Sequence, residues 1–270
     1  MNRRNEHTGM ASARLILALA ATALIALALA LGLGLAARGD EYAYSAERPT
    51  AEFHFTRLLY SDRGGGFGYR GSWEVDWPEA ETHFLQGVTR LTRVEASDRN
   101  ESRIIGLTDD AIFDYPWLYA VEVGRWYLNE IEAARLREYL LRGGFLMVDD
   151  FHGSYEWAGF MESMTRVFPD RPIIDIPEND EVLHVLYDLD QRIQIPGIAA
   201  LSYGVTYERD GVTPHWRGVY DDDGRLMVAI NHNMDLGDAW EHADDPRYPE
   251  PMTALAYRFA VNYLIYAMTH

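Results

Sequence analysis

One segment in the second half of the chain constrains the fold more than any other. Residues 140–153 read LLRGGFLMVDDFHG, and their Gly-Gly pair ends a helical pattern, because glycine readily takes the left-handed conformation that closes a helix. A short apolar strand from Phe145 to Val148 follows, and Asp149 and Asp150 come where that strand must leave its sheet. In open α/β sheets, ligands bind in the crevice beyond the carboxyl ends of the strands. The segment therefore predicts the place of a site.

Strands and helices alternate on both sides of this segment. Asn129, with Glu132 three residues later, predicts a capped helix that runs to Arg142. An acidic turn at 221–224 predicts a hairpin of antiparallel strands. Further strands are expected at 52–60, 116–123, 173–176, 215–220 and 225–230, and further helices at 76–92, 154–168, 180–189 and 252–268. This alternation predicts an α/β fold, a three-layer, mainly parallel sheet with an added antiparallel hairpin.

The first residues predict membrane insertion. Three arginines (Arg3, Arg4 and Arg14) precede an uninterrupted apolar run over 15–37, and about 20 such residues are enough to cross a bilayer as a helix. We expect a transmembrane anchor there; a cleaved signal peptide is the alternative. The basic residues then stay in the cytoplasm, and the remainder faces the periplasm. The expected parts are a basic cytoplasmic segment (1–14), the anchor (15–37), a linker (38–50) and one α/β domain (51–270).

Composition limits the partners and the chemistry. The chain has 42 acidic and 24 basic residues, a formal net charge of −18, so phosphate backbones are repelled and we expect no nucleic-acid partner. It has no cysteine, which excludes a thiolate nucleophile, a disulfide and a cysteine metal site. No cofactor is indicated.

The strand ends supply the first candidate ligand-binding residues. Asp149 and Asp150, with His152 two residues on, could share a proton or bind a divalent cation. The alternative is that the two carboxylates cap the next helix. Glu122 and Arg125 close the neighbouring strand at the comparable position, where they form either a ligand clamp or an ion pair.

A glycine-rich segment after the first strand supplies further candidates. Arg63, Arg70 and Trp73 lie in or beside it, and the arginines could bind a ligand carboxylate or hydroxyl. Its glycines do not open a helix, as a dinucleotide site requires. Loops after parallel strands emerge on one side of a sheet, so we expect this segment at the same edge as Asp150.

A polar loop over 231–242 holds a second set of candidate metal ligands. His232, Asp235, Asp238 and His242 could ligate a cation, but none of them shows the His-x-x-x-His spacing of a helical zinc site. We therefore expect no metal and interpret the loop as structural.

Several motifs together resemble a known family. They are Arg57-x-x-Tyr60, Tyr115-Pro116-x-Leu118-Tyr119, Gly143-Gly144-Phe145-Leu146-x-x-Asp149-Asp150, Asp235-x-Gly237-Asp238-Ala239-Trp240 and Tyr257-Arg258-x-x-Val261-Asn262-Tyr263. Over about 52–268 the chain resembles a bacterial family of domains of unknown function in the class I glutamine amidotransferase-like superfamily. The resemblance implies a flavodoxin-like three-layer sheet and membrane-associated relatives.

The resemblance also implies what the chain is not. In true class I amidotransferases a strand bounded by Gly-Gly delivers a nucleophilic cysteine at its end, and here Asp150 occupies that place. Since the chain has no cysteine, glutaminase chemistry is excluded. A branch of the superfamily that acts in sugar utilisation similarly replaces the cysteine.

We therefore expect a membrane-anchored, envelope-facing domain that binds a ligand or partner without thiol catalysis. One alternative is a carboxylate- or metal-dependent hydrolase acting on saccharides or small polar envelope substrates. Another is a structural component of a membrane complex. The expected partners are the cell membrane, through the N-terminal helix, and an envelope protein or saccharide. The expected location is the inner membrane, or the periplasm if the signal is cleaved.

Overall fold

The computed structural model describes residues 49–63 and 71–270, which fall within one compact unit, Ala46–His270. The expected anchor at 15–37, nearly all of the expected linker, and Arg70 lie outside the described residues. Among the helices that the structure describes, none is both long and apolar enough to cross a bilayer.

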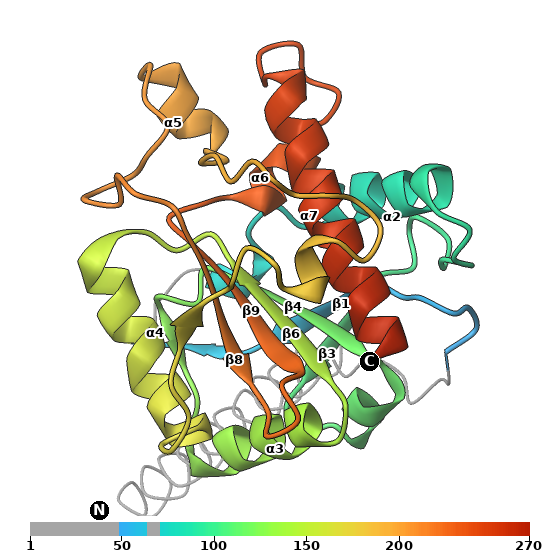
Figure 1. Cartoon of the computed structure of the whole chain (residues 1–270), viewed down its shortest axis with the longest axis vertical. Coiled ribbons are helices and arrows are strands. Elements are labelled where there is room, and N and C mark those ends of the chain that lie inside the picture. Colours follow the sequence, from blue (N-terminus) through green and yellow to red (C-terminus); the bar gives the residue numbers. More distant parts are fainter. Residues whose placement is uncertain (1–48, 64–70) are drawn as a thin grey trace, which may run out of the picture. The chain divides into compact units, whose positions relative to one another are not determined.

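A seven-stranded sheet forms the centre of the unit (Figure 1). Its order is β3-β1-β4-β6-β9-β8-β7, and the first five of these strands are parallel. The strands are β1 (Thr56–Leu59), β3 (Arg103–Gly106), β4 (Trp117–Val121), β6 (Phe145–Asp149), β7 (Ile174–Asp175), β8 (His215–Tyr220) and β9 (Leu226–His232). Strand β8 is antiparallel to both of its neighbours. The predicted α/β sheet, mainly parallel with an antiparallel hairpin, is confirmed. A separate antiparallel pair joins β2 (Ser61–Asp62) to β5 (Trp126–Tyr127).

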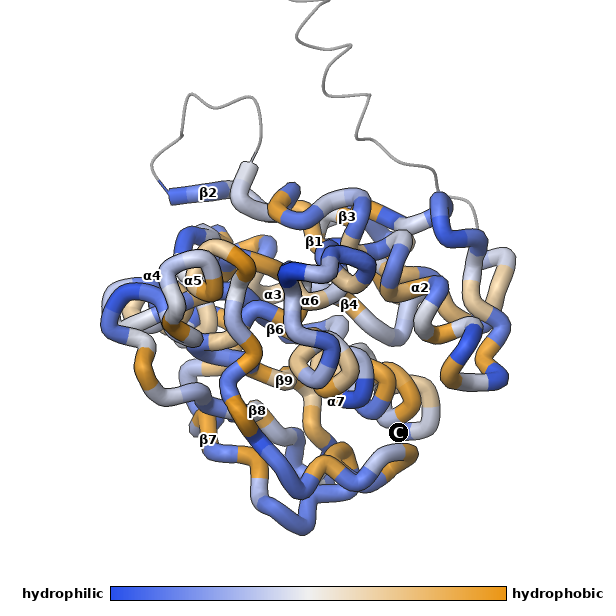
Figure 2. The backbone as a smooth tube through the Cα atoms, turned by 90° about the horizontal axis from the view of Figure 1, so that it is seen from above, coloured by the Kyte–Doolittle hydropathy of each residue, from blue (hydrophilic) through white to orange (hydrophobic). Residues whose placement is uncertain are grey.

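Helices cover both faces of the sheet (Figure 1). Side chains of α2 (Glu79–Leu91), α6 (Leu236–Glu241) and α7 (Glu250–Thr269) enter one apolar core, and those of α3 (Glu130–Leu141) and α4 (Gly153–Val167) enter another. Successive residues of a strand point to opposite faces, so on β6 Met147 faces the first core and Val148 the second. Figure 2 shows apolar stretches along strands and along α7.

The helix before β6 begins and ends as predicted. Asn129 Oδ1 accepts hydrogen bonds from the amides of Ile131 and Glu132, and Glu132 Oε2 accepts one from the Asn129 amide. Gly143 has a φ of 109°, in the left-handed region that favours glycine. These local signals fix where β6 starts, and hence where Asp149 and Asp150 leave the sheet.

Three sequence predictions about local structure need correction. The helix predicted over 180–189 is one short 3-10 turn, Glu181–Leu183, because Asn262 on α7 bonds the backbone at Val182 and Tyr187 instead. The helix predicted to start at Ser154 starts at Gly153. Strand β3 was not predicted, since only two of its residues are aliphatic and it lies at the sheet edge.

Candidate functional site

Carboxylates from three loops that follow parallel strands meet at the carboxyl edge of the sheet. Asp76 lies between β1 and α2, Asp150 directly follows β6, and Asp235 lies between β9 and α6. One carboxylate oxygen of each lies within 4.8 Å of the other two. We call these three residues the aspartate triad. The parallel order of the strands brings together residues that are far apart in the sequence.

Asp150 is not needed to cap the helix that follows it. The amides at the start of α4 have other acceptors: Glu156 Oε2 is 2.6 Å from the His152 amide, and Asn233 Oδ1 is 2.8 Å from the Gly153 amide. Asp210 Oδ1 accepts from the Ser154 amide at 3.0 Å. The cap interpretation is therefore wrong for Asp150.

His152 is the hydrogen-bond partner of Asp150. Its Nε2 lies 3.1 Å from Asp150 Oδ1, and both side chains are almost fully buried. Burial disfavours the charged imidazole, but the hydrogen bond and the negative charge of Asp150 together raise the pKa of His152. The sequence predicted that these two residues lie together, and the structure brings their side chains into contact.

Asp149 has a structural partner on another helix. Its Oδ2 accepts hydrogen bonds from the amides of Leu236 (2.7 Å) and Gly237 (2.9 Å), in the first turn of α6, and one from the Tyr119 hydroxyl. Burial first, and then the charge of Asp150, raise the pKa of Asp149 to about 8. Asp149 thus caps a helix, but that helix is α6 and not the next one, α4, as the cap interpretation had it.

Asp76 is positioned by a buried arginine. Arg57, on β1, is fully buried, pairs with Glu81 on α2, and donates hydrogen bonds of 2.8 Å to the carbonyls of Trp73 and Val75. Because Val75 directly precedes Asp76, these bonds hold the turn that carries the Asp76 carboxylate. Burial first, and then the charge of Asp150, raise the pKa of Asp76 well above its usual range.

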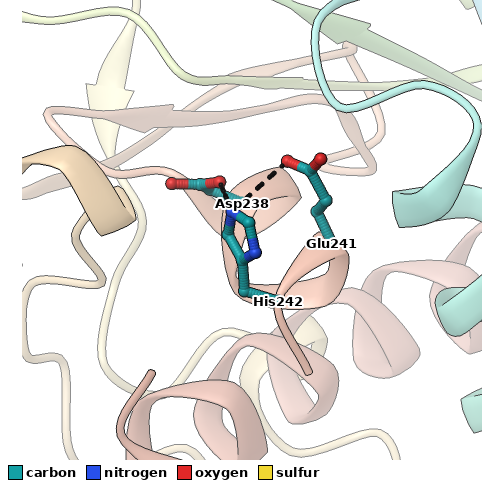
Figure 3. A group of neighbouring side chains, drawn as sticks. All are labelled: Asp238, Glu241 and His242. Carbon is teal, nitrogen blue, oxygen red and sulfur yellow. Dashed lines mark ion pairs between the residues drawn. The ribbon is translucent and has the colours of Figure 1, made fainter. Parts of the chain in front are cut away.

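A second group of possible ligands lies on α6. Figure 3 shows Asp238, Glu241 and His242 on one side of this helix, with His242 Nε2 3.0 Å from Asp238 Oδ1 and 3.6 Å from Glu241 Oε2. The other oxygen of Asp238 accepts a hydrogen bond from the amide of Ile198, at the start of α5 (Ile198–Ser202). Burial is the largest influence on Asp238 and raises its pKa to about 6.

The two groups adjoin each other. Asp235 Oδ1 accepts a hydrogen bond of 2.7 Å from the Asp238 amide. Burial raises the pKa of Asp235 well above its usual range, with the charge of Asp150 as the next cause. Carboxyl groups at this edge are thus crowded and poorly solvated, which disfavours their charged forms.

Backbone strain is concentrated at the same edge. In the described part of the chain the non-glycine residues with positive φ are Asp76, Glu122, Asp150, Arg209 and Asn233. Two of them belong to the aspartate triad, Glu122 follows β4, and the others contact α4, where Arg209 pairs with Glu156 at 2.7 Å. Such conformations cost about 1–3 kcal/mol each and are typical of functional sites.

Glu122 and Arg125 form an ion pair at the rim of this edge. Arg125 Nε lies 3.4 Å from Glu122 Oε2 and 3.6 Å from Glu156 Oε1, and half of its side chain is exposed. Burial first, and then the charge of Asp150, raise the pKa of Glu122 to about 8. The structure places the two side chains within ion-pair distance, and the ligand clamp stays a prediction.

The structure places Arg63 near this edge, as predicted, but turned toward α4. Its amide donates to the Arg125 carbonyl at 2.8 Å, and its guanidinium pairs with Glu162 and donates to the Gly159 carbonyl. Trp73 is 6% exposed and lies in the core beside α3 and α4. A role of either side chain in binding stays a prediction.

His232 belongs to neither group of possible ligands among the described residues. Its Nε2 lies 3.2 Å from the Gly153 carbonyl, and its ring centroid is within 5 Å of the Phe151 and Trp157 rings. Burial lowers the pKa of His232 to about 4. The structure therefore separates the metal candidates that the sequence suggested. Asp235 belongs to the aspartate triad, Asp238 and His242 belong to the group on α6, and His232 belongs to neither.

Sequence reasoning missed the site roles of Asp76, Glu156 and Glu241. Asp76 was interpreted only as the start of a helix. The rule that loops after parallel strands share an edge could have identified it, because it follows the glycine-rich loop after β1.

The fold and the site define an α/β domain of doubly wound type with an acidic cluster at the carboxyl edge of its sheet. Residues 54–268 match the family model described as Domain of unknown function (DUF4159), and the chain belongs to that family. No curated protein matches the chain. The predicted membership of a domain-of-unknown-function family is confirmed.

Proposed function

We propose that this chain is a membrane-anchored, envelope-facing domain that binds a ligand through the carboxylates at the carboxyl edge of its sheet. The observation that carries the proposal is the aspartate triad, which is assembled from three loops at this edge and in which Asp150 does not cap the helix that follows it. Two of the three residues have strained backbones. Clustered carboxylates favour a cationic ligand, or one that donates several hydrogen bonds.

The superfamily placement is part of this proposal. Numbered along the chain, the five parallel strands follow the order 2-1-3-4-5, which is that of flavodoxin-like sheets. Asp150 follows β6 at the place where class I amidotransferases carry their cysteine. These two features support placing the chain in the amidotransferase-like superfamily, as a member without a catalytic thiol.

The envelope-facing orientation rests on the sequence. The arginines before the apolar run at 15–37 favour a cytoplasmic N-terminus. We expect the chain to fractionate with the inner membrane and its domain to be digested when protease is added to spheroplasts. Full protection of the domain would contradict the orientation, and a soluble form beginning near Arg38 would contradict the anchor.

A hydrolase is the second candidate. The specific observation in its favour is that two carboxyl groups that both feel the charge of Asp150 have separated pKa values, about 8 for Glu122 and about 6 for Asp238. Pairs of carboxyl groups with separated pKa values can divide the roles of acid and base between them. Turnover of envelope saccharides that Glu122→Gln abolishes would favour this candidate.

The proposal is tested with Asp150→Asn, which keeps the shape of the side chain and removes its charge. The full chain is melted with a panel of divalent cations, polyamines and saccharides. We expect at least one member to raise the melting temperature of the parent, and Asp150→Asn to lose that shift while its unliganded melting temperature changes little. Asp175→Asn is the control, because the Asp175 side chain is 76% exposed on β7. No shift with any member, or equal shifts in the parent and Asp150→Asn, would contradict the proposal.

A further inference from the structure

We propose that the aspartate triad binds one hard divalent cation of the calcium class. This inference rests on the proposed function and names its ligand. One oxygen from each of Asp76, Asp150 and Asp235 lies within 4.8 Å of the other two. Calcium binds carboxylate oxygens at about 2.3–2.6 Å, so two oxygens on the same ion are at most about 5 Å apart. The triad therefore spans a distance that one calcium ion can bridge.

Buried oxygens without partners point independently to a missing ligand. Within the described residues, Asp76 Oδ2 and Asp149 Oδ1 are both buried and have no hydrogen-bond partner, and the Asp149 side chain is fully buried. A buried polar atom left without a partner costs about 1–3 kcal/mol. A cation held by the triad would supply a partner for the Asp76 carboxylate.

The free oxygen of Asp76 and the hydrogen-bonded oxygen of Asp149 both lie beside Gly237. A Cβ atom at Gly237 would collide with Asp76 Oδ2 and with the Tyr119 hydroxyl. The Gly237 amide donates to Asp149 Oδ2, which also accepts from that hydroxyl. Glycine at 237 thus leaves the space that the Asp76 carboxyl group occupies beside the start of α6.

The donor set favours a hard cation over zinc. All three ligands are carboxylates, whereas zinc sites are usually built from histidine and cysteine. The imidazole of His152 lies beside the triad, and its Nε2 bonds Asp150 Oδ1. His152 therefore orients a ligand, as the outer partners of metal ligands commonly do.

The neighbouring group on α6 does not need a cation. Both oxygens of Asp238 have partners, the Ile198 amide and His242 Nε2, and Glu241 adds a second carboxylate beside the imidazole (Figure 3). The contacts of His242 with both carboxylates account for this group without a cation. The cation is assigned to the triad alone.

The test is calorimetric titration of the full chain, first freed of metal with a chelator, with CaCl₂, MgCl₂ and ZnCl₂ in separate runs. We expect one calcium site with a Kd no weaker than about 1 mM, the range of extracellular calcium modules. Asp76→Asn should weaken calcium binding at least tenfold. Asp175→Asn, on the exposed side of β7, should bind calcium like the parent. Absence of calcium binding up to 10 times that concentration, or equal binding by Asp76→Asn and the parent, would overturn the inference.

A second measurement covers the case in which Asp76→Asn does not fold. Terbium substitutes for calcium and luminesces when a nearby tryptophan is excited, and Trp77 adjoins Asp76 in the sequence. The parent should give terbium luminescence that calcium displaces, and its absence would overturn the inference. If the melting panel yields an organic ligand that depends on Asp150 but calcium does not bind, the proposed function stands and this inference fails. If no ligand binds at all, both fail.

Discussion

His232 is a buried base whose titration should weaken the fold in acid. Its pKa is lowered from 6.5 to about 4 by burial, so between these values the unfolded chain binds the proton and the folded chain does not. The stabilisation is complete above pH 6.5 and is lost as the pH falls toward 4, by up to about 1.4 kcal/mol per pH unit. Urea unfolding at pH 6.5, 5.5 and 4.5 measures it. His232→Gln should reduce the slope over this range, and an unchanged slope would show that His232 does not cause it.

Glu122 should change the pH dependence of stability in the opposite direction, so that the fold weakens as the pH rises. Its pKa is raised from 4.5 to about 8, first by burial and then by the charge of Asp150, so the folded chain keeps a proton that the unfolded chain has lost. Stability therefore falls as the pH rises from 4.5 to 8. The Glu122 side chain is 18% exposed, so solvent reduces the effect only in part.

We expect Glu122→Gln to flatten the decline in the free energy of unfolding between pH 6 and pH 8. The parent and the variant are compared by urea unfolding at half-unit steps of pH, with chelator present so that no cation binds. A parallel decline in both proteins would assign the effect to another carboxyl group.

The ion pair between Arg57 and Glu81 joins three elements, because it ties β1 to α2 and to the turn before Asp76. Arg57→Met leaves the Glu81 carboxylate buried without its counter-charge. Breaking a buried pair in this way costs about 3–5 kcal/mol, so chemical unfolding should show a loss of that size.

The double variant Arg57→Met/Glu81→Leu is the matched control. With both charges removed, most of the lost stability should return, while calcium binding stays weak because the turn that carries Asp76 is no longer held. A double variant that binds calcium like the parent would show that Arg57 does not position the triad.

Elements whose signals are local were predicted well. The helix from Glu130 to Leu141 has its capping box and its terminal glycine in the sequence, and both are present in the structure. The turn at Glu181–Leu183 could not be predicted, because its form depends on Asn262, a residue about 80 positions away. Strand β3 depends in the same way on pairing with β1.

At the scale of the whole molecule, the sequence predicts which edge of the sheet holds the site. It does not predict which residues meet there. Asp150 and His152 adjoin in sequence, and the structure pairs them. Asp76 joins them only because β1 and β6 flank β4 in the sheet, which no local pattern shows. The different roles of Asp149 and Asp150 also depend on tertiary structure, because the amides that Asp149 caps lie on α6.

Anomalous diffraction tests the central claim, that the carboxylates at the edge of the sheet bind a ligand, most directly. Crystals of the full chain are grown with MnCl₂, because manganese prefers oxygen ligands and scatters anomalously. The account predicts one strong peak that lies within about 2.6 Å of an oxygen from each of Asp76, Asp150 and Asp235, and that CaCl₂ displaces. A map with no peak at the triad, or with peaks only at exposed carboxylates elsewhere, would contradict it.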